Sequence, residues 1–176
     1  RLIIMQDFVH LHVHTQYSLL DGQASVARLV DKAMQNGMKG IAVTDHGNMF
    51  GIKEFTNYVN KKNSGPKGEI KDLKKRLVGI EAGSIECEDK EAEVAACKAK
   101  IVEAENKLFK PIIGCEMYVA RRTMDLKEGK QDQSGYHLIV LAKNETGYHN
   151  LIKLVSHAWT RGYYMRPRTD RSELEI

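Results

Sequence analysis

The feature that most constrains this chain is the alternation of short β-rich runs with longer runs of helical spacing. The short runs predict strands at residues 8–14, 40–44, 111–120 and 135–142. The longer runs predict helices at residues 25–36, 51–62 and 144–161. Because strands that alternate with helices are typical of βαβ units, we predict an α/β fold with a parallel sheet or barrel.

The ends of the first predicted helix have suitable local chemistry. Ser25 stands at its start, where a hydroxyl can cap free backbone N–H groups. Gly37 stands just past its end, where a left-handed residue is usual. Both ends of this helix are therefore predicted from the sequence.

Residues 63–110 have a different character from the rest of the chain. They begin with a turn-rich stretch, residues 63–68, which we expect to break the helical pattern. Charged sequence with spaced apolar residues follows and predicts two amphipathic helices. We interpret the segment as a helical insertion between residues 1–62 and 111–176. It is either a solvated hairpin, which the charge favours, or an arm that binds a partner.

Length and composition limit the classes of protein. A chain of 176 residues can bury one core, and a net charge of +4 permits contact with a phosphate polyanion without arguing for it. Three cysteines without CxxC spacing predict neither a disulfide framework nor a structural zinc site. We find no signal peptide and no membrane-spanning run, so we expect a cytoplasmic protein without membrane contact.

Three histidines alternate with apolar residues near the start of the chain. On a strand, His10, His12 and His14 would share one face. Imidazoles two residues apart can ligate one ion or two adjacent ions when carboxylates are near. An HxH pattern alone is a weak signal.

Acidic and imidazole side chains recur where other predicted strands end. Asp45 and His46 follow the strand at residues 40–44, and Asp21 lies in a loop after the histidines. Barrel enzymes keep their chemistry at the carboxyl ends of strands, so these groups could meet there. Asp21 is also compatible with an ordinary turn before a glycine.

Two further polar residues fall in apolar strands. Glu116 interrupts the run 112–119, and His137 opens the run 138–141. A buried carboxylate is costly unless it is paired or binds metal. Taken singly, each residue is more often a satisfied core group or a strand end. The recurrence of such residues on successive strands is what favours a metal site.

Several motifs together resemble one family, the polymerase and histidinol phosphatase (PHP) domain at the amino terminus of the bacterial DNA polymerase III alpha subunit. They lie, in this order, at residues 10–22, 44–51, 110–116, 136–138, 141–152 and 166–170. The resemblance covers nearly the whole chain outside residues 63–110. Because several motifs match in the same order, the resemblance is specific to this family.

The resemblance implies a distorted (β/α)7 barrel with up to three divalent ions, often zinc or manganese, at one end. The family's later ligands have no counterpart here, so we expect an amino-terminal, incomplete part of the barrel. Its unclosed edge would favour self-association. By position, Asp45 would orient His46, and His10 would be a polar interior residue. The implied metal ligands are His12, His14, Asp21, His46, Glu116 and His137.

The family implies a metal-dependent phosphoesterase site in a protein of DNA replication. Its substrate would be a mispaired 3′ DNA end, as in a proofreading 3′–5′ exonuclease, or pyrophosphate. The whole protein would be a DNA-directed DNA polymerase, a nucleotidyltransferase whose partners are DNA and other replisome subunits. Two alternatives stay open: a catalytically silent module that stabilises the polymerase or docks a proofreading subunit, and a stand-alone small-molecule phosphatase.

Basic residues gather in two places outside the motif residues. Residues 161–171 mix arginines with tyrosines, and Arg121 and Arg122 form a second basic spot. Either could contact a DNA backbone. A solvated surface is the more common role of such residues. The isolated His149 and His157 are predicted to be ordinary helix residues.

Overall fold

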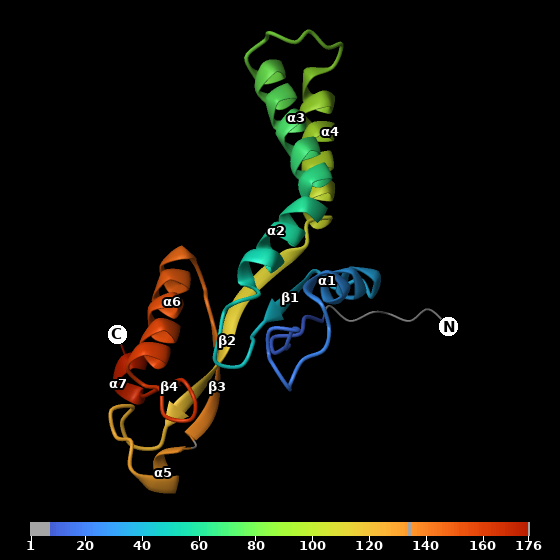
Figure 1. The fold of residues 1–176 in the computed structure, drawn as a ribbon. Helices are drawn as coiled ribbons and strands as arrows, with labels where there is room; N and C mark the ends of the chain where they lie inside the picture. Colours follow the sequence, from blue (N-terminus) through green and yellow to red (C-terminus); the bar gives the residue numbers. More distant parts are fainter. Residues whose placement is uncertain (1–7, 134, 176) are drawn as a thin grey trace. The chain divides into compact units, whose positions relative to one another are not determined.

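The computed structural model describes residues 8–133 and 135–175 as a mixed α/β structure (Figure 1). Its helices are α1 (Val26–Gln35), α2 (Ile52–Lys62), α3 (Ser64–Glu81), α4 (Lys90–Asn106), α5 (Gly129–Gln133), α6 (Glu145–Thr160) and α7 (Arg171–Leu174). Its strands are β1 (Gly40–Val43), β2 (Lys110–Ala120), β3 (Gly135–Leu141) and β4 (Arg168–Thr169). Within the described part of the chain, no helix is long and apolar enough to cross a membrane.

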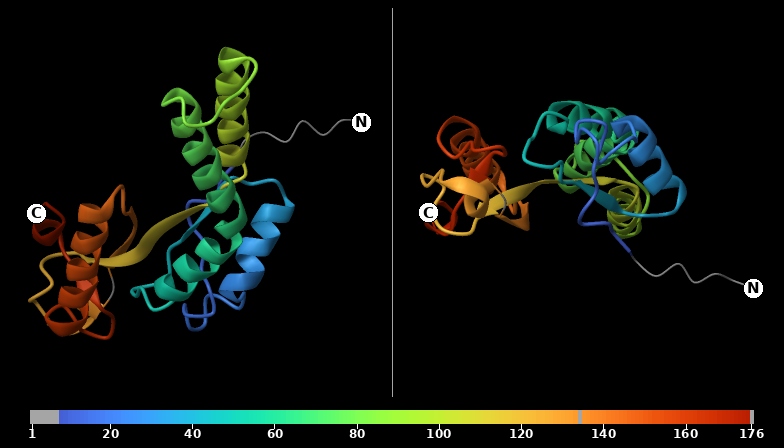
Figure 2. Two further views of the ribbon diagram at one scale, coloured as in Figure 1. Left: turned by 90° about the horizontal axis from the view of Figure 1, so that it is seen from above. Right: turned by 60° about the horizontal axis from the view of Figure 1, so that its bottom comes forward.

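The chain separates into two compact units. The hairpin unit is Tyr58–Lys110, and the larger unit consists of Arg1–Asn57 and Pro111–Ile176. Within the hairpin unit, α3 and α4 pack side by side (Figure 2). The side-chain amide of Asn63 closes this unit at its base, because it both donates to and accepts from the backbone of Phe109.

The two helices expected in this segment are α3 and α4, but the break expected at residues 63–68 is confined to Asn63, between the end of α2 at Lys62 and the start of α3 at Ser64. Helix α3 begins at Ser64, so Gly65 and Pro66 lie in its first turn. The first backbone N–H groups of a helix have no partner within the helix, and a proline there loses no hydrogen bond.

Helix α1 has the caps that the sequence predicts, and strand β1 begins at Gly40 as predicted but ends one residue early, at Val43. The Ser25 hydroxyl accepts a hydrogen bond from the backbone N–H of Arg28, and Gly37 has a φ of 76°. One face of the helix, with Val26 and Val30, is buried, and all four residues of β1 are buried. Each such aliphatic side chain contributes roughly 1.5–3 kcal/mol on burial.

Strand β2 is the centre of the sheet. It lies between β1 and β3 in the strand order, and β4 also pairs with it. The pairing with β4 is parallel, as expected, whereas β2 and β3 are antiparallel. The expectation of a purely parallel arrangement is therefore wrong for this pair.

Residues 8–14 are extended but do not form the regular strand that was predicted. The carbonyls of His10 and Val13 accept hydrogen bonds from the backbone N–H groups of Ala42 and Thr44. Between these two hydrogen bonds, residues 10–13 span three residue steps, whereas the facing residues 42–44 span two. Residues 10–13 therefore contain one extra residue, as in a β-bulge. The hydroxyl of Thr44 then replaces a backbone carbonyl as the acceptor for Val13 N–H.

Helix α6 packs on β2 through a small apolar core. Cys115 and Met117 of β2 and Leu151 and Ala158 of α6 are fully buried together. Since side chains alternate along a strand, this packing directs the neighbouring residues Glu116 and Tyr118 to the opposite face. The core therefore fixes where the candidate site lies.

In the basic tail, Arg161, Arg166 and Arg171 are exposed, as on a solvated surface, whereas Arg168 is not. The guanidinium of Arg168 is buried and donates to the backbone carbonyls of Gly162, Met124, Leu126 and Asp132. These bonds tie together the turn after α6 and the loop before α5.

Candidate metal centre

The loop that follows β1 carries the first group of site residues. The backbone N–H of Gly47 donates to the carbonyl of Glu116, and the N–H of Glu116 donates to the carbonyl of Asp45. This parallel bridge places His46 beside Glu116. Gly47 has a φ of 68°, and a Cβ there would lie 2.9 Å from a carbon of Pro167. The close approach of backbone and neighbouring rings requires a glycine at this position.

The carboxylate of Glu116 lies at the centre of four imidazoles. Its Oε2 is 2.7 Å from Nε2 of His14, 3.7 Å from Nε2 of His12 and 3.9 Å from Nδ1 of His46. Its Oε1 is 2.8 Å from Nδ1 of His137. The carboxylate that would be costly without partners is thus surrounded by imidazoles from other parts of the chain.

His137 reaches Glu116 through the antiparallel register of β2 and β3. His137 lies opposite Tyr118, two residues from Glu116 and on the same face of β2. Diagonal neighbours of this kind lie within reach of long or ring side chains. His137 is therefore brought to the site by strand pairing rather than by strand ends alone.

The cluster divides into two groups that could each hold a metal ion. They are His12, His14 and Glu116, and His46, Glu116 and His137, with the candidate ligand atoms of each group within 4.8 Å of one another. Glu116 belongs to both groups. Imidazole nitrogens and a shared carboxylate are ligands suited to zinc or manganese.

The charge of the cluster affects Glu116. Burial acts to raise its pKa, but the neighbouring His46, together with contacts from His137 and His14, outweighs burial and lowers the pKa. The carboxylate is therefore ionised at neutral pH, which is the form that binds a cation.

His46 provides the test of whether these residues fit a metal. Its Nδ1 lies 2.7 Å from the carboxylate of Asp21, while its buried Nε2 has no hydrogen-bond partner among the described residues. A buried nitrogen without a partner is costly, and a metal ion would satisfy it. The hydrogen bond to His46 lowers the pKa of Asp21, so this carboxylate is also ionised.

Asp45 does not have the contact that was expected. Its carboxylate accepts hydrogen bonds from the backbone N–H of Thr15 at 2.6 Å and from the Thr15 hydroxyl at 2.8 Å. Burial raises the pKa of Asp45. Asp45 therefore holds the loop that follows His14, and Asp21 takes the place at His46 that was expected of Asp45.

His10 does not join the other histidines. It is exposed, its ring contacts Phe8, and it lines a separate hollow with Ala33 and Ile41. The interior position expected for His10 is wrong because the extra residue at positions 10–13 interrupts the strand alternation. His12 remains at the site, with its Nδ1 2.8 Å from the hydroxyl of Thr44.

Tyr118 and Arg166 were missed as site residues. The Tyr118 ring stacks on His46 at a centroid distance of 4.1 Å, and its hydroxyl accepts a hydrogen bond from Arg166 at 2.7 Å. Burial raises the pKa of Tyr118. The alternation of β2 could have indicated Tyr118, two residues after Glu116, and Arg166 lies in the motif at residues 166–170, but its contact with Tyr118 has no local signal.

A pocket of about 370 Å³ adjoins His46. Its wall is mostly aromatic and apolar, with Asp21 and Arg166 as charged groups. The lining residues are Gln16, Tyr17, Leu19, Asp21, His46, Asn48, Phe50, Tyr118, Trp159, Tyr163, Met165, Arg166 and Pro167. This volume lies within the roughly 300–1,000 Å³ that is typical of ligand pockets.

Comparison with known proteins identifies the family of this chain. The family model of the PHP domain matches residues 10–176, and the chain belongs to that family. The resemblance predicted from the motifs is thus confirmed.

Similar curated proteins are named DNA polymerase III subunit alpha. That of Borreliella burgdorferi is 39% identical over 171 residues, and that of Treponema pallidum is 40% identical over 164 residues. That of Aquifex aeolicus is 33% identical over 176 residues. The matches cover 96%, 93% and 97% of this chain and 11%, 10% and 11% of the relatives. The chain thus spans about a tenth of the length of these relatives.

Proposed function

We propose that this chain is the PHP domain of a bacterial replicative DNA polymerase alpha subunit and contains a metal-dependent phosphoesterase centre. One observation supports the proposal above all others. Glu116 lies between two histidine groups, and each of its oxygens is within 2.8 Å of an imidazole nitrogen. The names of the relatives support the connection with replication.

The proposed ligands are His12, His14, Asp21, His46, Glu116 and His137. Divalent ions, zinc or manganese and up to three in a complete domain, would supply an activated water and stabilise the leaving oxygen of a phosphoester. Glu116 would bridge the two groups. The Asp21 carboxylate orients His46 through the hydrogen bond at Nδ1 of His46, and Asp21 would become a ligand when metal is bound.

The proposed domain organisation follows the sequence. Residues 1–62 and 111–176 would belong to a distorted (β/α)7 barrel, of which this chain is an amino-terminal part, and residues 63–110 would be a helical insertion. The whole protein would be a DNA-directed DNA polymerase in the cytoplasm, with DNA and other replisome subunits as partners. Polymerisation would need a separate magnesium site.

The substrate of the centre would be a mispaired 3′ DNA end or pyrophosphate. A silent module that stabilises the polymerase is the competing function. Five of the six proposed ligands fall into the two groups that share Glu116, which favours a metal-binding centre over a degenerate one. Turnover requires its own measurement.

Metal content is the test. Elemental analysis of the chain after reconstitution with zinc or manganese should find metal, and His12→Ala and Glu116→Ala should lower it. Glu116→Ala should lose more, because Glu116 belongs to both groups and His12 to one. His149→Ala is the matched control, since His149 is an exposed histidine of α6 outside the cluster.

The outcomes are distinct. Metal that is present in the chain and in the control, and lost in the cluster variants, supports the centre. Metal-dependent hydrolysis of a phosphoester by the same protein then supports turnover. A reconstituted chain without metal would overturn the proposal and favour the silent module.

A further inference from the structure

A platform of exposed aromatic rings stands beside the cluster. Trp159 and Tyr163 stack at a centroid distance of 5.7 Å with an interplanar angle of 20°. Phe50 lies 6.4 Å from Trp159. Trp159 is 43% exposed and Tyr163 is 49% exposed, although both belong to residue types that are usually covered. Large rings that remain exposed in a pocket offer faces for a planar ligand.

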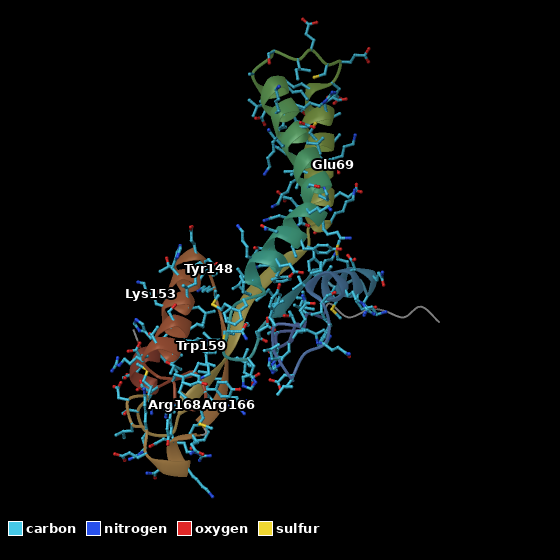
Figure 3. All side chains as sticks on the ribbon, in the orientation of Figure 1. Glu69, Tyr148, Lys153, Trp159, Arg166 and Arg168 are labelled. Carbon is cyan, nitrogen blue, oxygen red and sulfur yellow. The ribbon has the colours of Figure 1, made fainter. Side chains whose placement is uncertain are left out.

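The platform is fixed to the loop that carries His46. The indole N–H of Trp159 donates to the carbonyl of Gly47 at 2.7 Å. Figure 3 shows that Trp159 lies at the end of α6 nearest Arg166, whereas Tyr148 lies near the other end. Gly47 follows His46 in the chain, and His46 and Trp159 line the same pocket. A ligand that stacks on Trp159 would therefore lie near His46.

Arg166 supplies a positive charge to the same pocket. Its guanidinium lies 5.1 Å from the Tyr118 ring centroid and donates to the Tyr118 hydroxyl. The arginine is thereby held by the tyrosine that stacks on His46. Asp21 is the opposing charge in the pocket. The pocket thus has one cationic and one anionic group beside an aromatic wall.

One strained backbone position, Met165, lines the pocket, and a second, Leu20, lies between the lining residues Leu19 and Asp21. Leu20 has a φ of 74° and Met165 a φ of 62°, and both side chains are exposed. Left-handed φ is costly for residues other than glycine and clusters at ligand-binding sites. Met165 lines the pocket at the apex of a turn closed by a hydrogen bond from Tyr164 N–H to the carbonyl of Arg166.

We infer that this pocket binds a nucleobase, with the ring stacked on the platform of Trp159, Tyr163 and Phe50 and the attached phosphate near Arg166. The inference deepens the proposed function and rests on it. It assigns to the centre a single-stranded DNA end rather than pyrophosphate. Pyrophosphate has no ring to stack and carries several negative charges, whereas Arg166 is the only lysine or arginine among the described lining residues.

The single tryptophan of the chain makes the inference measurable without catalysis. Intrinsic fluorescence of Trp159 is titrated with a five-nucleotide oligothymidylate in the presence of a chelator, so that no cleavage occurs. The comparison probes are an abasic oligomer with the same number of phosphates, and pyrophosphate.

Base stacking on an aromatic platform predicts saturable quenching by the oligothymidylate. The abasic oligomer and pyrophosphate should bind roughly 5- to 150-fold more weakly, the range that stacking of one base accounts for. Tyr163→Ala should weaken binding of the oligothymidylate, and Tyr163→Phe should restore it because the ring is retained. Tyr148→Ala is the matched control and should leave binding unchanged, since Tyr148 lines a different hollow.

Equal binding of the abasic oligomer or pyrophosphate would overturn the inference, as would equal effects of Tyr163→Ala and Tyr148→Ala. The outcome is separable from that of the proposed function. A chain that holds metal but shows no base-dependent quenching refutes the nucleobase pocket and leaves the metal centre intact. Base-dependent quenching in a chain that cannot be loaded with metal supports the pocket and refutes the metal centre.

Discussion

Replacement of Arg168 by methionine should destabilise the unit that carries the site. Methionine has a comparable length and keeps the apolar stem, so the change removes mainly the guanidinium donors. Three of the hydrogen bonds from Arg168 to backbone carbonyls are buried, those to Gly162, Asp132 and Met124. At about 1 kcal/mol for each carbonyl left without a donor, the loss of unfolding free energy is about 3 kcal/mol.

Urea unfolding followed by Trp159 fluorescence measures this loss. With a slope of roughly 1–3 kcal/mol per molar urea, the midpoint should fall by roughly 1–3 M. Arg168→Lys keeps the charge and should lose less. Arg171→Met is the control, because the Arg171 side chain is 91% exposed and pairs only within α7 and its cap; its effect should be below about 0.5 kcal/mol.

The result that would refute the reasoning is an effect of Arg168→Met no larger than that of Arg171→Met. It would mean that the freed carbonyls find water or other donors at no cost. If the expected loss is found, the turn that carries Tyr163 and Arg166 depends on the buried guanidinium of Arg168.

Three further predictions concern single groups. Burial acts to raise the pKa of Asp170, but the Ser172 hydroxyl and three backbone N–H groups outweigh it, so the pKa lies below its ordinary 3.8. The contribution of Asp170 to the unfolding free energy should be complete above pH 3.8 and should decline as the pH falls toward the lowered pKa. Urea midpoints of the chain and of Asp170→Asn, measured at several pH values, test this. Burial raises the pKa of the Cys115 thiol to about 12, so Cys115 should resist iodoacetamide at pH 8 while the half-buried Cys87 is alkylated, as read by mass spectrometry; equal alkylation in the native protein would contradict this. Gly47→Ala should cost more than the roughly 1 kcal/mol expected for Gly83→Ala, since both glycines have positive φ but only the first meets a proline ring and a tyrosine ring; equal midpoint losses in urea would show that those rings yield freely.

The helices and strands with strong local signals could be predicted from the sequence. The first helix is bounded by Ser25 and Gly37, as predicted, because capping depends on neighbours in the chain. Two local predictions failed for local reasons that the residue pattern does not show. Pro66 is tolerated in the first turn of α3, and the extra residue at positions 10–13 breaks a strand that the alternation predicted.

The candidate ligands could be named from the sequence, but their contacts could not. The resemblance singled out His12, His14 and Glu116, and the structure brings them together. The exchange of roles between Asp21 and Asp45 could not be foreseen, because it depends on which loop each carboxylate faces after folding.

The sequence by itself determined the alternation of helices and strands, the family and the residue types available for a metal site, since these follow from periodicity, capping and motif order. Only the tertiary structure decided that His137 reaches Glu116 through an antiparallel register. It also decided that Trp159 and Arg166 line a pocket at His46. The physical reason is that long-range pairing and burial place side chains far apart in the chain beside one another, and no local pattern encodes which of them will meet.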